Sequence, residues 1–200
     1  MSDYKQPPEI SRRTVIAGAT LIPVAALTAS AQQRPAALTP SQKRILEAFV
    51  DRLCPKDDLG PGAVECGAAN YIDQQLAGYL ASEKDTIVAG LEAVDAYAAS
   101  AHGASLASLP PDQRDAVLTA VENGSAGSVP NARAFFTRVR RLTLEGMFGD
   151  PYYGGNTNFA GWDLIKYPGP RLTVGPEQQK MSTPATPYHR SVWGGQHNGH

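Results

Sequence analysis

The chain has 200 residues, enough for one domain with extensions, and 42% of them are hydrophobic, which is sufficient for a core. Its formal net charge of -1 supplies no attraction for nucleic acid or for an anionic membrane surface. Proline and glycine gather in residues 1–40 and 146–200, so helical patterns are confined to the middle. We therefore expect one helical domain between two irregular extensions, and no nucleic-acid partner.

The N-terminus carries the order of features that defines a secretory signal. Arg12 and Arg13 precede a mildly apolar run over residues 15–27, and small residues then supply a cleavage site after Ala31. Adjacent arginines are typical of the twin-arginine export route. We expect residues 1–31 to be a twin-arginine signal peptide that is removed from the mature protein. The alternatives are an uncleaved anchor and an ordinary helix with basic residues at its start.

Cys54 and Cys66 are the only two cysteines. An even number of cysteines in an exported protein favours a disulfide between them. The turn at residues 60–62, Gly-Pro-Gly, can bring the ends of two helices within bonding distance. Metal binding is the alternative, although two cysteines at this spacing without a nearby histidine make a poor zinc site.

Five helices are expected in the middle of the chain, because apolar residues recur there with helical spacing. They run from Pro40 to the residues before Pro55, from about Ala63 to Leu80, from around Ile87 to a stop at Gly103, from Pro111 to a stop at Gly124, and from Pro130 to Met147. No segment alternates polar and apolar residues for long enough to predict a strand. The expected class is all-α, a small array of about five helices followed by an ordered aromatic loop and an extended tail.

The expected parts of the chain follow from these patterns. They are the signal peptide over residues 1–31, a linker over 32–38, the helical domain over 39–148, a loop rich in aromatic residues, glycine and proline over 149–174, and the tail over 175–200.

No pattern that performs catalysis or holds a cofactor occurs in the sequence. Glycine-rich nucleotide loops, the G-x-S-x-G nucleophile motif and the C-x-x-C-H haem motif are absent. Three histidines, His189, His197 and His200, lie in the polar tail, where a solvated histidine is more common than a copper or zinc ligand. We therefore expect no catalytic, cofactor-binding or metal-binding residue in this chain. A stand-alone metal-binding protein that uses the tail histidines is the alternative.

The stretch from Glu145 to Arg171 combines helix-breaking residues with aromatic ones. Aromatic side chains are costly to leave in water and scarce in disordered segments, so this loop should be ordered. Tyrosine and tryptophan are enriched in the cores of interfaces. We expect partner-binding residues here and in the tail, namely Tyr152, Tyr153, Trp162, Tyr167, Arg171 and Trp193. The alternatives are a loop that only caps its own helices and a small-ligand pocket around Trp162.

Two motifs of this stretch resemble a known family. DPYYGGN begins at Asp150 and GWDLIKYPGPR spans Gly161 to Arg171, and they follow the helix FFTRVRRLTLEGMFG and the signal SRRTVIA. This combination resembles the gluconate 2-dehydrogenase subunit 3 family, over roughly residues 39–171. Members are the small, or gamma, subunits of bacterial flavin-dependent dehydrogenase complexes for sugars and sugar acids.

The resemblance implies a subunit without catalytic residues of its own. In the family a large FAD-dependent flavoprotein of the glucose-methanol-choline type performs the oxidation, and a multihaem cytochrome c subunit passes the electrons on. The small subunit binds the large one and supports its folding and export. The implied partners are therefore the large subunit, the cytochrome c subunit and the twin-arginine translocase. The implied location is the periplasm or the periplasmic face of the inner membrane, with FAD in the partner and no cofactor in this chain.

Overall fold

The structure is a computed structural model, and it describes residues 36–180, 182 and 185–193. The expected signal peptide, with Arg12, Arg13 and Ala31, lies outside the described residues. So do His197 and His200 of the tail.

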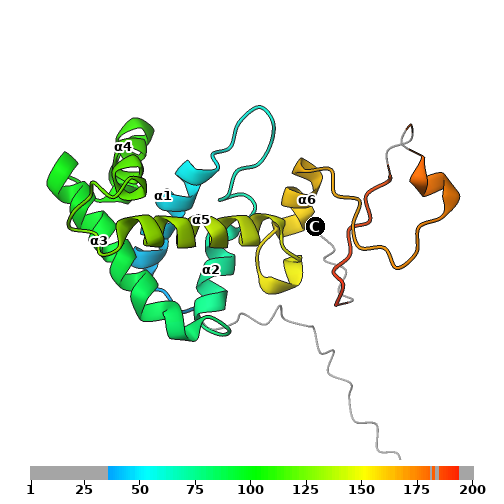
Figure 1. The fold of residues 1–200 in the computed structure, drawn as a ribbon, viewed down its shortest axis with the longest axis horizontal. Coiled ribbons are helices and arrows are strands. Elements are labelled where there is room, and N and C mark those ends of the chain that lie inside the picture. The colour runs from blue at the N-terminus through cyan, green and yellow to red at the C-terminus, as the bar shows by residue number, and fades with distance from the viewer. Residues whose placement is uncertain (1–35, 181, 183–184, 194–200) are drawn as a thin grey trace, which may run out of the picture. The chain divides into compact units, whose positions relative to one another are not determined.

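The described residues fold into helices and contain no strand. The α-helices are α1 (Pro40–Leu53), α2 (Ala68–Leu76), α3 (Lys84–His102), α4 (Pro111–Glu122), α5 (Ala132–Phe148) and α6 (Ala160–Leu164) (Figure 1). Short 3-10 helices stand between or after them: η2 (Ala81–Glu83), η3 (Leu106–Ser108), η4 (Pro151–Tyr153), η5 (Thr157–Phe159) and η6 (Pro176–Gln179). The all-α prediction is confirmed. The sixth α-helix and two of the 3-10 helices lie within the stretch expected as a loop.

Helix α1 begins where the sequence places its start. The Thr39 hydroxyl accepts a hydrogen bond from the Gln42 N–H, and the Gln42 side chain accepts one from the Thr39 N–H at 2.9 Å. This reciprocal pair is a capping box, and Pro40 occupies the first helical position, where no N–H is needed. Pro55 follows the last turn and prevents its continuation.

Helix α2 is shorter than expected at both ends. Its start was expected near Ala63, but Gly67 has φ 75°, a left-handed conformation that a right-handed helix cannot include. The first helical residue is therefore Ala68. At the other end the Leu80 N–H donates to the Gln75 carbonyl, and this turn leads into η2 and directly into α3. Gly67, which interrupts the apolar pattern of the expected helix, was the sequence signal for this start.

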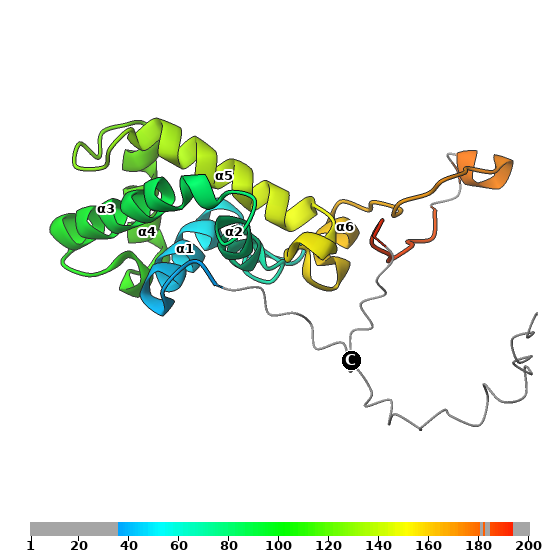
Figure 2. The same ribbon diagram turned by 90° about the horizontal axis from the view of Figure 1, so that it is seen from below.

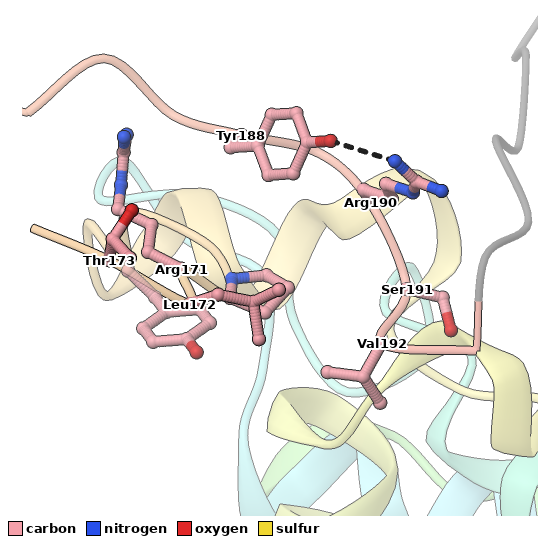
Figure 3. Close-up of a pocket in the computed structure, with 9 residues that line it drawn as sticks. Arg171, Leu172, Thr173, Tyr188, Arg190, Ser191 and Val192 are labelled. Carbon is pink, nitrogen blue, oxygen red and sulfur yellow. Dashed lines mark hydrogen bonds between the residues drawn. The ribbon is translucent and has the colours of Figure 1, made fainter.

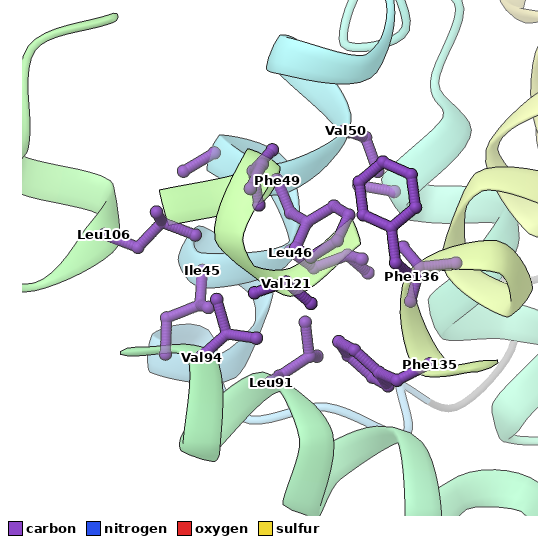
Figure 4. Close-up of a cluster of buried hydrophobic side chains, with 14 of the residues drawn as sticks. Ile45, Leu46, Phe49, Val50, Leu91, Val94, Leu106, Val121, Phe135 and Phe136 are labelled. Carbon is purple, nitrogen blue, oxygen red and sulfur yellow. The ribbon is translucent and has the colours of Figure 1, made fainter. Parts of the chain in front are cut away.

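Helix α5 is the central element of the helical domain. Figures 1 and 2 show it running from α3 and α4 at one end to α6 at the other, and it packs against every other α-helix. Its Phe135 and Phe136 rings each lie 5.9 Å from the ring of Phe49 on α1. Figure 4 shows these rings surrounded by aliphatic side chains from α1, α3, α4 and η3. Gly90 on α3 leaves the space that the Phe135 ring fills.

Cys54 and Cys66 are free thiols in the structure. The loop between them is closed by a hydrogen bond of 2.8 Å from the Ala63 N–H to the Cys54 carbonyl. Burial, together with smaller contributions from the nearby Cys54 and Glu65, raises the pKa of Cys66 to about 11. Burial also raises the pKa of Cys54. Both thiols therefore stay protonated at neutral pH, which is unfavourable for thiolate chemistry or metal binding. The disulfide stays a prediction.

Within the part of the chain that the structure describes, no helix has the length and apolar character needed to cross a membrane.

Candidate partner-binding surface

Asn156 holds the loop that follows α5 in place. It is 0% exposed, and its Nδ2 donates to the Gly149 carbonyl at 2.9 Å. Its Oδ1 accepts from the N–H groups of Gly161, at 2.9 Å, and Trp162, at 3.4 Å. Its own N–H donates to the Gly146 carbonyl at 2.6 Å. One buried side chain thus connects the end of α5 to the start of α6. Its φ of 45° is a left-handed conformation, which asparagine tolerates better than most residues.

Trp162 lies beneath the loop rather than on its outer face. Trp162 is only 5% exposed, and its indole N–H donates a hydrogen bond to the Phe148 carbonyl at 2.9 Å. Its ring lies 5.3 Å from that of Phe159 and 4.8 Å from that of Tyr167. We therefore do not retain Trp162 as a partner-binding residue or as the wall of a ligand pocket. It caps the end of α5, the alternative that the sequence left open.

Tyr152 and Tyr153 form the outer face of the loop. Tyr152 is 49% exposed, and the two rings meet edge to face with centroids 5.3 Å apart. Their backbone is firmly held, because Asp150 accepts from the Tyr152 N–H at 2.9 Å and the Gln75 amide donates to the Tyr153 carbonyl at 3.2 Å. An exposed aromatic pair on a fixed backbone loses little conformational freedom when it binds a partner.

The tail returns to the loop and packs on it. His189 Nε2 lies 2.7 Å from the Asp163 carboxylate, and the His189 ring stacks on Phe159 with centroids 4.8 Å apart. The sequence predicted a solvated histidine there, and His189 is indeed exposed, but the sequence did not reveal its carboxylate partner 26 residues away. Further along, the ring of Trp193 lies 5.6 Å from that of Tyr152. Residues 189–193 of the tail therefore lie against the loop and share its surface.

Exposed apolar side chains concentrate on this surface. Thirteen large hydrophobic residues are exposed in the described part of the chain, and nine of them belong to the loop and the tail. They are Tyr152, Tyr153, Ile165, Tyr167, Leu172, Val174, Tyr188, Val192 and Trp193, and together we call them the loop-tail surface. Large exposed apolar patches mark protein-binding or membrane-binding sites.

Arg171 connects the two halves of the loop-tail surface. Its Nη2 donates to the Thr186 carbonyl at 2.6 Å, across 15 residues of sequence. Of the six residues expected to bind a partner, five therefore lie on or beside this surface, namely Tyr152, Tyr153, Tyr167, Arg171 and Trp193.

The described residues offer no arrangement for metal chemistry. No group of three or more His, Cys, Asp or Glu side chains among them is placed to hold a metal ion. Two arginines of α5 pair with carboxylates of the helical domain instead. Arg138 makes two hydrogen bonds of 2.7 Å to Glu83, and its guanidinium lowers the pKa of that carboxyl. Arg141 pairs with Glu145 at 2.9 Å.

Comparison with known proteins decides the family. The sequence model of the family described as gluconate 2-dehydrogenase subunit 3 matches residues 40–169. The chain belongs to this family. The match begins at the first residue of α1 and includes the loop held by Asn156, but it ends at Gly169, before the tail. No curated protein and no solved structure matches the chain.

Membership of the gluconate 2-dehydrogenase subunit 3 family makes the chain a small subunit of a dehydrogenase complex. A subunit requires a surface that binds its partners. The exposed aromatic and aliphatic side chains of the loop-tail surface are typical of such an interface. The family match covers Tyr152, Tyr153, Ile165 and Tyr167 of this surface, whereas Leu172, Val174 and the residues of the tail lie beyond it.

Proposed function

We propose that the chain is the non-catalytic small subunit of an FAD-dependent dehydrogenase complex that oxidises sugars, polyols or sugar acids. Its partner is a large flavoprotein subunit of the glucose-methanol-choline type, which carries the FAD, and a multihaem cytochrome c subunit accepts the electrons. The small subunit binds the large one and supports its folding and maturation. The observation that supports this proposal best is the loop-tail surface, which holds nine of the thirteen large hydrophobic residues that are exposed in the described part of the chain.

The docking face of this proposal is the loop-tail surface. Its tyrosines and tryptophan provide large, stiff side chains of the kind that dominate binding energy at interfaces. Its backbone is already ordered by Asn156, by Asp150 and by the contact between His189 and Asp163. Binding therefore requires little further ordering of the small subunit.

Weakening the loop-tail surface should release the flavoprotein without unfolding the small subunit. We expect the double change Tyr152→Ser and Trp193→Ser to weaken binding to the flavoprotein by about 30-fold or more, because two central aromatic residues are truncated. A pull-down of the flavoprotein by the tagged small subunit measures this. Tyr79→Ser is the matched control, since Tyr79 is 91% exposed but lies outside the loop and the tail. Equal binding by the double variant and the control would contradict the proposed docking face.

We also propose that the complex is exported by the twin-arginine translocase to the periplasm or the periplasmic face of the inner membrane. The adjacent Arg12 and Arg13 before an apolar run support this route. A folded, cofactor-loaded partner can then travel with the signal of the small subunit. In that oxidising compartment we expect Cys54 and Cys66 to become joined, since the closed loop between them holds their backbones together.

Replacing both Arg12 and Arg13 by lysine should retain the small subunit and the flavoprotein in the cytoplasm. The reason is that the translocase recognises the arginine pair, whereas the remaining apolar run is a weak signal on its own. Cell fractionation followed by immunoblotting of both subunits measures the result. A flavoprotein that still appears in the periplasm would show that it does not depend on this signal.

A further inference from the structure

A pocket of about 770 Å³ opens within the loop-tail surface. One wall is the segment 167–173, and the other is the tail segment 188–192. Figure 3 shows Arg171, Leu172 and Thr173 on one side of this space and Tyr188, Arg190, Ser191 and Val192 on the other. Nothing in the proposed function so far assigns a role to this pocket.

The two walls are joined by interactions between segments that are distant in the sequence. The Tyr188 N–H donates to the Pro168 carbonyl at 3.0 Å, and Arg171 donates to the Thr186 carbonyl at 2.6 Å. Gly169, with φ 86°, lies so close to the backbone of Tyr188 that a side chain would not fit between them. The pocket is therefore a formed part of the folded chain.

The pocket carries positive charge without a counter-charge. Its lining includes Arg171 and Arg190 but no aspartate or glutamate. No ion pair of either arginine occurs among the described residues, and the buried Nε of Arg171 has no hydrogen-bond partner there. Within the described part of the chain, the Arg190 side chain makes one hydrogen bond, to the Tyr188 hydroxyl at 3.1 Å. By contrast, Arg52 in the helical domain pairs with Asp115 at 2.7 Å.

The remaining lining is mainly apolar. Tyr167, Leu172 and Val192 are exposed side chains that border the two arginines. This combination suits a ligand that places a carboxylate beside an aliphatic or aromatic group. A simple inorganic anion would leave the apolar part of the pocket in water.

We propose that this pocket binds an acidic segment of the large flavoprotein subunit, in which an aspartate or glutamate stands next to an apolar side chain. The carboxylate accepts hydrogen bonds from the N–H groups of Arg190 that have no partner among the described residues, and such charge-assisted bonds are stronger than neutral ones; Arg171 on the opposite wall adds positive charge. The apolar neighbour packs against Leu172 and Val192. This inference rests on the proposed function, because it requires the flavoprotein to bind the loop-tail surface.

The affinity of the mature small subunit for the flavoprotein tests the proposal. We expect Arg190→Gln to raise the Kd about tenfold and to reduce its dependence on salt concentration, since one charge pair is removed. Arg140→Gln is the matched control, because Arg140 is exposed on α5 outside the pocket, and its Kd should stay within about twofold of that of the wild type. Thermal melts of both variants establish that they are folded.

The outcomes separate this inference from the proposed function. If the wild-type chain binds the flavoprotein but Arg190→Gln binds it equally well with the same salt dependence, the pocket proposal is overturned and the proposed function stands. If the wild-type chain does not bind the flavoprotein at all, both are overturned.

A crosslinking experiment tests the chemistry of the ligand directly. The variant Arg190→Lys keeps the charge and provides an amine, which a carbodiimide couples only to a carboxylate in contact with it. Mass spectrometry of the complex should find the substituted position joined to an aspartate or glutamate of the flavoprotein. Sedimentation with phosphatidylglycerol vesicles tests a lipid surface instead. Vesicle binding that Arg190→Gln abolishes, together with unchanged affinity for the flavoprotein, would overturn the proposal.

Discussion

Replacing Trp162 by alanine should lower the free energy of unfolding of the small subunit by about 3–5 kcal/mol, the range found when a buried tryptophan or phenylalanine is removed. The Trp162 side chain fills the space between the loop and the end of α5, and Trp162 is only 5% exposed there. Its removal also leaves the Phe148 carbonyl without the hydrogen bond of 2.9 Å from the indole. Chemical denaturation of the isolated subunit measures the change.

Trp193→Ala is the matched control for this prediction. Trp193 is 63% exposed, so its truncation should change the free energy of unfolding by about 0.5 kcal/mol or less. In flavoprotein binding we expect the reverse order, with the larger loss for Trp193→Ala, because Trp193 is the proposed contact. If the Trp162→Ala variant kept wild-type stability but lost flavoprotein binding, Trp162 would be an interface residue, and its role as a cap would be contradicted.

Replacing Asn156 by alanine should lower the free energy of unfolding by about 3 kcal/mol. The change leaves the Gly161 N–H and the Gly149 carbonyl without their partner, and each buried unsatisfied group costs about 1–3 kcal/mol. Because these bonds hold the loop to α5, the exposed Tyr152 and Tyr153 should also lose their fixed positions. Binding of the flavoprotein should then weaken although neither tyrosine has been changed.

Asn158→Ala isolates the role of the Asn156 side chain. Both asparagines have left-handed backbones, with φ 45° at Asn156 and φ 53° at Asn158, so alanine meets similar backbone strain at either position. Asn158, however, is exposed, so its side chain supports no buried network. We expect Asn158→Ala to lower the free energy of unfolding by about 1 kcal/mol, as measured by the same denaturation experiment. Equal losses for the two variants would show that the buried hydrogen bonds of Asn156 contribute nothing.

The amino-acid sequence by itself determines the helical class and most helix boundaries of this protein. Local signals suffice for these features, since a capping box at Thr39 and Gln42 or a left-handed Gly103 after α3 depends only on neighbouring residues. The motifs in the loop were also sufficient to indicate the gluconate 2-dehydrogenase subunit 3 family, which the match over residues 40–169 confirms.

The tertiary structure alone decides which aromatic residues of the loop are buried and which are exposed. Trp162 and Tyr152 are similar in sequence context, each close to glycines and apolar residues, but one caps α5 and the other lies on the outer face. The difference arises from contacts between distant segments: Asn156 with α5, Gln75 with Tyr153, and His189 with Asp163. No periodicity or local propensity encodes such pairings, because they form only when the whole chain has packed.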